Sequence, residues 1–129
     1  MTNSIQWFER ALYDLDTARD LLKSGKYLYV AFMCHQALEK ALKSVYLNLK
    51  NEMPPYIHNL PKLSELIGLK QTLSDEQTDF LQNMNIFYIS SRYPDDIDDM
   101  KKMCTNITSE NQIKKTEEFL KWLEPKSKS

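Results

Sequence analysis

The chain has 129 residues, a length that suits one domain and lets it bury roughly two-thirds of its unfolded surface without disulfide staples. With 42% hydrophobic and 27% charged residues, two glycines and five prolines, the composition excludes a turn-rich β architecture and a wholly disordered chain. The formal net charge of −1 excludes the strong overall positive charge of many sequence-tolerant nucleic-acid binders, so any such binding must be local.

Targeting and metal-binding patterns are the next features to weigh. The first ten residues lack a basic start, and no run approaches the roughly eighteen apolar residues that a membrane span needs, so we expect a cytoplasmic protein without a membrane segment. Cys34 and Cys104 lie far apart without companions at metal-ligand spacing, which indicates neither a disulfide framework nor a zinc site. We expect Cys34 to be a small core residue, and we expect no cofactor.

The first predicted helix runs from about residue 5 to residue 23. Apolar side chains recur along one face, at Trp7, Ala11, Leu15, Ala18 and Leu22. Asn3 or Ser4 caps the start, and Gly25 supplies the stop. The acidic residues of the segment, Asp14 among them, fall off this stripe and are expected to face water.

The second predicted helix, from residue 27 to about residue 49, is apolar on more than one side and should be the central helix. One stripe consists of Tyr27, Ala31, Cys34, Leu38, Ala41, Val45 and Leu49, and the other of Leu28, Phe32, Leu42 and Tyr46. His35 and Glu39 interrupt the second stripe, so they form a polar patch that needs partners. The apolar surplus of this helix predicts a homodimer.

The middle of the chain is divided by helix-breaking residues. The pair Pro54 and Pro55 precedes a short helix over residues 60–67 that closes near Gly68. Residues 74–77 form a capping-box pattern that opens another helix, which Pro94 ends.

The last third of the chain is more irregular in pattern. Residues 95–108 are expected to form a loop or one irregular turn, and Ser109 with Gln112 resembles the capping box of a final helix. The acidic cluster Asp95, Asp96, Asp98 and Asp99 has no turn glycine and no EF-hand ligand series, which favours a solvated loop over a metal site. We expect one domain over residues 1–124 and a frayed tail over 125–129.

Three parts of the chain carry a combined pattern, in a consistent order and spacing. They are Trp7 with Ala11, Asp14, Leu15 and Ala18; the stretch AFMCHQALEKALK at 31–43; and His58-Asn59-Leu60 followed one helix later by Ser91-Arg92-Tyr93-Pro94-Asp95. Together they resemble the HEPN family, a nucleotide-binding domain, over about residues 5–123. The resemblance implies an all-α, up-and-down helical bundle of four main helices plus one short helix. It also implies a homodimer, often encoded beside a nucleotidyltransferase in toxin–antitoxin pairs.

Many members of that family are metal-independent ribonucleases in which four to six residues separate an Arg from a following His. Here the positions that the His would occupy after Arg92 are Ile97, Asp98 and Asp99, so the motif is broken. An Asp with an ordinary pKa is a poor replacement for imidazole in exchanging a proton with a ribose hydroxyl near neutral pH. Ribonuclease activity by the usual route of the family is therefore not expected.

The candidate ligand-binding residues are Arg92, Tyr93, His58, Glu39, Lys43, Gln36 and His35. Arg92 either presents its planar fork to a phosphate or neutralises a helix C-terminus. His58 either caps or braces the short helix, or contributes to acid–base chemistry if the fold brings it near Arg92. His35 with Glu39, and Glu39 with Lys43, are spaced as ordinary i,i+4 pairs.

The leading hypothesis is a non-enzymatic or residually active HEPN-type module that dimerises and binds a nucleotide or RNA, or works with a nucleotidyltransferase partner. One alternative is a ribonuclease toxin that uses Arg92 with a non-standard acid–base partner. Another is a non-catalytic protein-interaction bundle. A carboxylate-bridged metal bundle is disfavoured because the sequence has no Glu-x-x-His pair.

Overall fold

The computed structural model describes residues 3–90 and 94–128, with the side chains of 88–90 and 94–96 left aside. Every regular element in these ranges is helical, as the sequence predicts. Six α-helices and one 3₁₀ helix follow in the order α1 (Ser4–Lys23), α2 (Tyr27–Lys50), α3 (Leu60–Leu66), α4 (Asp75–Ser90), α5 (Pro94–Met103), α6 (Asn106–Leu123) and η1 (Glu124–Ser127). The expected count of four main helices and one short helix was therefore too low.

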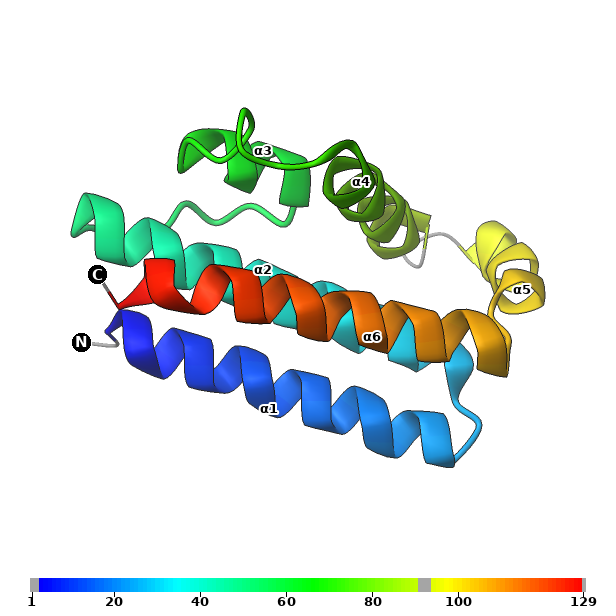
Figure 1. The fold of residues 1–129 in the computed structure, drawn as a ribbon. Helices are drawn as coiled ribbons and strands as arrows, with labels where there is room; N and C mark the ends of the chain where they lie inside the picture. Colours follow the sequence, from blue (N-terminus) through cyan, green and yellow to red (C-terminus); the bar gives the residue numbers. More distant parts are fainter. Residues whose placement is uncertain (1–2, 91–93, 129) are drawn as a thin grey trace.

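The helix α2 occupies the centre of the fold. In Figure 1, α1, α2 and α6 lie roughly parallel along the length of the molecule, with α1 running opposite to the other two. The helix α4 crosses this direction and is viewed almost along its axis, so the up-and-down arrangement holds for only part of the fold. Because α2 touches each of α1, α3, α4, α5, α6 and η1, it is the element that all others pack against.

Local capping fixes the first two helices where the sequence predicts them. The Asn3 side chain accepts a hydrogen bond from the Gln6 amide at 2.9 Å, and the Gln6 side chain accepts one from the Asn3 amide at 3.0 Å, which completes a capping box. Gly25 then adopts a φ of 73°, which lets the chain turn sharply into α2. The far end of α2 is closed by Asn51 in the left-handed conformation.

The apolar surplus of α2 is used within the chain. Its central residues are fully buried, namely Val30, Ala31, Cys34, Ala37, Leu38, Ala41, Leu42 and Val45. In the second stripe Leu42 is fully buried and Leu28, Phe32 and Tyr46 are half-buried, while Leu49 of the first stripe is 54% exposed. Much of the apolar surface that suggested a homodimer is therefore covered by other helices of the chain, and the homodimer stays a prediction.

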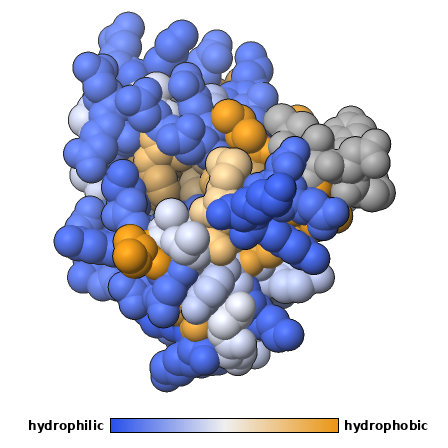
Figure 2. All heavy atoms as spheres, turned by 90° about the vertical axis from the view of Figure 1, so that its right-hand side faces the viewer, coloured by the Kyte–Doolittle hydropathy of each residue, from blue (hydrophilic) through white to orange (hydrophobic). Residues whose placement is uncertain are grey.

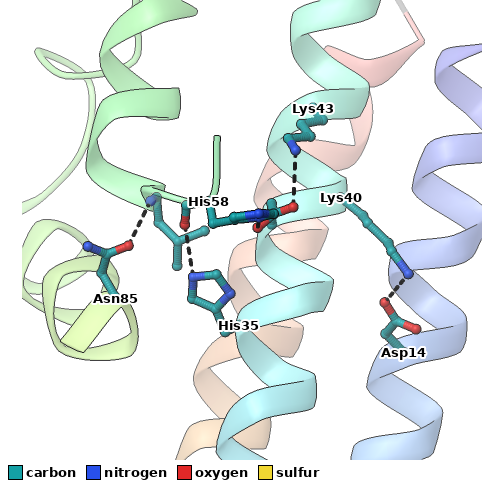
Figure 3. Close-up of polar contacts among 8 residues, drawn as sticks. Asp14, His35, Lys40, Lys43, His58 and Asn85 are labelled. Atoms are coloured by element: carbon teal, nitrogen blue, oxygen red, sulfur yellow. Dashed lines mark hydrogen bonds and ion pairs between the residues drawn. The ribbon is translucent and has the colours of Figure 1, made fainter. Parts of the chain in front are cut away.

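Asp14 corrects the expectation that the acidic residues of α1 all face water. It is 6% exposed, and its carboxylate lies 2.6 Å from the ammonium of Lys40 (Figure 3). Asp14 follows Ala11 by three positions and precedes Ala18 by four, so it shares their inward face. The ion pair with α2 offsets the cost of burying the carboxylate.

Residues 95–108 form a helix and a cap, where a loop was expected. Pro94 opens α5, which suits a ring that has no amide hydrogen to donate. Lys101 and Lys102 occupy the last turn, where cations meet the negative end of the helix dipole. Met100 near the end of this polar helix and Cys104 just after it are buried. The four-residue spacing of these two apolar side chains was masked by the acidic cluster around them.

The final helix begins four residues earlier than predicted. Thr105 caps α6 and forms a capping box with Thr108, whereas Ser109, the predicted cap, is buried inside the helix. Among the described helices, none combines the length and the apolar character that crossing a bilayer requires.

The end of the chain is packed through Ser127, where a frayed tail was expected. Ser127 is buried in η1, and the Asn48 side chain donates a hydrogen bond to the Lys126 carbonyl at 3.0 Å. The contact with α2 holds this segment in place, although its polar composition did not predict an ordered structure.

Candidate functional site

The polar patch predicted on α2 meets the connection between α2 and α3. One carboxylate oxygen of Glu39 accepts a hydrogen bond from the His58 Nδ1–H at 2.8 Å, and the other accepts from the Lys43 ammonium at 3.1 Å. The His58 carbonyl in turn accepts from the His35 Nε2–H at 3.0 Å (Figure 3). We call His35, Glu39, Lys43 and His58 the Glu39 cluster. It joins two histidines that are 23 positions apart in the sequence.

The segment that carries His58 is held on both sides. Asn59 caps α3 by accepting from the Lys62 amide at 3.1 Å, so the cap is this residue and not His58. The Leu60 amide donates to the side-chain oxygen of Asn85 at 3.1 Å, which ties the start of α3 to α4. His58 therefore ties the segment before α3 to α2, in agreement with the interpretation that it braces the short helix.

His35 is fully buried, and its protonation state follows from its surroundings. Burial lowers its pKa from 6.5 to about 4, while the Glu39 charge, the His58 carbonyl and the Asn85 side chain act in the opposite direction. A carbonyl can only accept, so the hydrogen sits on Nε2. His35 is thus a neutral donor at pH 7 that fixes the position of the His58 backbone. Glu39, one helical turn away, acts on His35 through its charge and hydrogen-bonds to His58 and Lys43.

Lys43 and Tyr56 extend the cluster to the surface. The Lys43 side chain is 6% exposed, and its ammonium lies 5.8 Å from the centre of the Tyr56 ring. The His58 ring meets the same ring edge-on, with centroids 5.2 Å apart. Tyr56 itself is 90% exposed. The expected pair of Glu39 with Lys43 is confirmed, and it supports an aromatic ring that faces solvent.

Sequence reasoning did not single out Tyr56. It lies in a proline-rich connection without periodicity, so no pattern linked it to α2. The available signal was its position two residues before His58, next to the rigid pair Pro54 and Pro55. Such a pair limits the conformations of the connection and presents the next side chain in a defined direction.

The remaining candidates are distributed differently. Arg92 and Tyr93 lie outside the described residues. Gln36 is half-buried on α2 and points roughly 100° around the helix from His35. Asp98 and Asp99 are exposed on α5. Within residues 3–90 and 94–128, no three His, Cys, Asp or Glu side chains gather in a way that could hold a metal ion.

The chemistry available to the Glu39 cluster follows from these contacts. A carboxylate orients an imidazole and fixes its tautomer, which is how proton-transferring histidines are commonly held. A lysine is neutralised by the same carboxylate, and an exposed aromatic ring lies above it. The fold and this cluster define a small all-α domain with an ionisable, aromatic-rimmed patch on its central helix.

Comparison with known proteins agrees with the all-α fold. The model of the HEPN domain family matches residues 5–126, and the chain belongs to that family. The crystal structure of TT1696 from Thermus thermophilus is similar, with a TM-score of 0.80, 23% sequence identity, and coverage of 98% of this chain and 99% of that one. At this identity the similarity supports the fold alone. No curated protein gives a significant match.

Proposed function

We propose that the chain is a nucleotide- or RNA-binding HEPN module that acts as a homodimer, together with a nucleotidyltransferase partner. The observation that carries the binding part is Tyr56, whose ring is 90% exposed and contacts both Lys43 and His58. An exposed ring held in a fixed direction is a surface on which a base stacks without regard to its identity. Binding by such a local feature is compatible with a net charge of −1.

Arg92 is the proposed phosphate ligand. It follows the end of α4 by two positions in the sequence, and α4 carries Asn85, which contacts the start of α3. A guanidinium offers two parallel donors to a phosphate, a geometry that an ammonium lacks. The proposal thus assigns the base to Tyr56 and the phosphate to Arg92.

The test is a titration of the purified chain with AMP and with a short single-stranded RNA. Tyr56→Ala should weaken binding by roughly 1–3 kcal/mol, the range for one stacked base, and Tyr56→Phe should retain it. Arg92→Ala should weaken it by roughly 1.5–3 kcal/mol, with at most partial rescue in Arg92→Lys. Tyr13→Ala is the matched control, because Tyr13 is also exposed but lies on α1. If Tyr56→Ala binds as well as the control, base stacking at this site is refuted.

A ribonuclease is the second candidate, and the His58–Glu39 pair favours it. Glu39 orients the His58 imidazole, so His58 would transfer the proton in a ribonuclease reaction. Ile97, Asp98 and Asp99, which occupy the positions of the motif histidine, cannot take this role. RNA incubated with the wild-type chain should then be cleaved, and cleavage should be lost in both His58→Gln and Arg92→Ala. Absence of cleavage together with retained binding would leave the binding module as the function. If the wild-type chain neither binds nor cleaves RNA, a protein-interaction bundle becomes the favoured function.

A further inference from the structure

A groove separates α4 from α6 and is closed at one end by the last residue of α5. Its volume is about 710 Å³. The apolar side chains that line it are Phe80, Met84, Ile86, Phe87 and Met103. Figure 2 faces the end of the molecule where α5 and the start of α6 lie, and it shows apolar atoms recessed between hydrophilic side chains.

Two of these side chains are more exposed than an apolar residue in a closed core would be. Ile86 is 58% exposed and Met103 is 59% exposed, although they come from different helices. Apolar side chains from separate elements that gather around one hollow mark a surface that associates with another molecule. The groove therefore offers an apolar surface on which a second molecule can pack.

The charges on the groove indicate what covers it. The charged residues of the lining are Glu76 and Asp79 on α4, and Lys115 on α6. One rim is therefore acidic and the other is basic. A second copy related by a two-fold axis that runs along the groove would place the acidic rim of each protomer against the basic rim of its partner, which makes the isologous interface complementary in charge.

We infer that the α4–α6 groove is the surface through which two copies of this chain associate, with the exposed Ile86 among the apolar side chains that become buried. This inference rests on the dimeric part of the proposed function and names the surface for it. The paired apolar side chains remove surface from water, and the opposed rims fix the mutual orientation of the two copies.

The experiment is sedimentation at micromolar concentrations, with circular dichroism as the check on folding. One chain has a mass of 15.2 kDa, so the wild type should sediment at about 30 kDa. Ile86→Asp should raise the dimer dissociation constant at least about tenfold, since it buries a charge in the apolar centre. Ile107→Asp is the matched control, because Ile107 is 80% exposed but lies outside the groove lining. The control should remain a dimer.

A charge exchange tests the same surface without touching its apolar centre. Lys115→Glu should weaken the dimer through repulsion from Glu76 and Asp79 of the partner, and adding Asp79→Lys should restore it. If Ile86→Asp does not fold, Lys115→Glu and the double variant with Asp79→Lys still test whether the groove is the dimer interface. A wild-type monomer would overturn both this inference and the dimeric part of the function, while nucleotide binding is measured separately. A wild-type dimer that persists in Ile86→Asp and Lys115→Glu would overturn the surface alone.

Discussion

The buried imidazole of His35 makes the stability of the fold depend on pH in a defined window. Burial lowers the pKa of His35 from 6.5 to about 4. Between these values the unfolded chain binds a proton that the folded chain does not, so acid favours unfolding. The contribution of neutral His35 is complete above pH 6.5 and is lost as the pH falls to about 4. A difference of about 2.5 units corresponds to about 3 kcal/mol.

The assay is urea unfolding of the wild type and of His35→Gln across that window. Glutamine keeps a side-chain donor for the His58 carbonyl but cannot be protonated, while the carboxylates titrate in both proteins and cancel in the difference. The unfolding free energy of the wild type relative to the variant should therefore fall by about 3 kcal/mol from pH 7 to pH 4. Parallel pH profiles would refute the argument.

Nuclear magnetic resonance gives an independent measurement if the glutamine variant is too unstable. The chain has two histidines, so its imidazole signals can be assigned with one additional variant, His58→Gln. The His35 signal should stay in the neutral state down to about pH 5, one unit above the pKa of about 4 that burial imposes. Protonation of His35 above pH 6 would show that the site is open to water.

Three further predictions concern the core and the caps. Asp14→Ala should cost roughly 2–3 kcal/mol in urea unfolding, because it leaves the partly buried Lys40 without its 2.6 Å partner; an unchanged midpoint would contradict the ion pair as a source of stability. Burial raises the pKa of the Cys34 thiol to about 12, so a thiol reagent at pH 8 should label Cys34 only at the rate of unfolding, and rapid labelling in native buffer would be the contrary result. Thr105→Ala should lower stability by about 1 kcal/mol through loss of the α6 cap, whereas Thr105→Ser should be nearly neutral; equal losses in both variants would argue against capping.

Much of the helical framework was predictable from local signals. The periodic apolar residues of α1 and α2, the Asn3 cap and the turn at Gly25 all act within a few residues of one another, so the sequence alone placed these two helices closely. The 74–77 capping box is also present, with the Ser74 hydroxyl accepting from the Gln77 amide. Local signals did not predict α5, because the many acidic residues of this segment suggested a loop and its apolar residues are few.

The binding candidates were predictable as residue types but not as a site. The polar interruption at His35 and Glu39 was visible on α2, and it correctly required partners. Which partners it found depends on how the connection before α3 folds back on α2, and no short-range pattern encodes that path. Tyr56 was missed for the same reason, because its surroundings are defined by contact with Lys43 of α2. The inward position of Asp14, by contrast, follows from its spacing to Ala11 and Ala18 on α1.

The sequence by itself determined the helical class, the central role of α2 and the break in the ribonuclease motif, because these follow from periodicity and from residue identity. Only the tertiary structure decided that His58 meets Glu39, that the middle of α2 is buried, and that an apolar groove lies between α4 and α6. Contacts between distant segments depend on crossing angles and on side-chain packing, which are properties of several helices together.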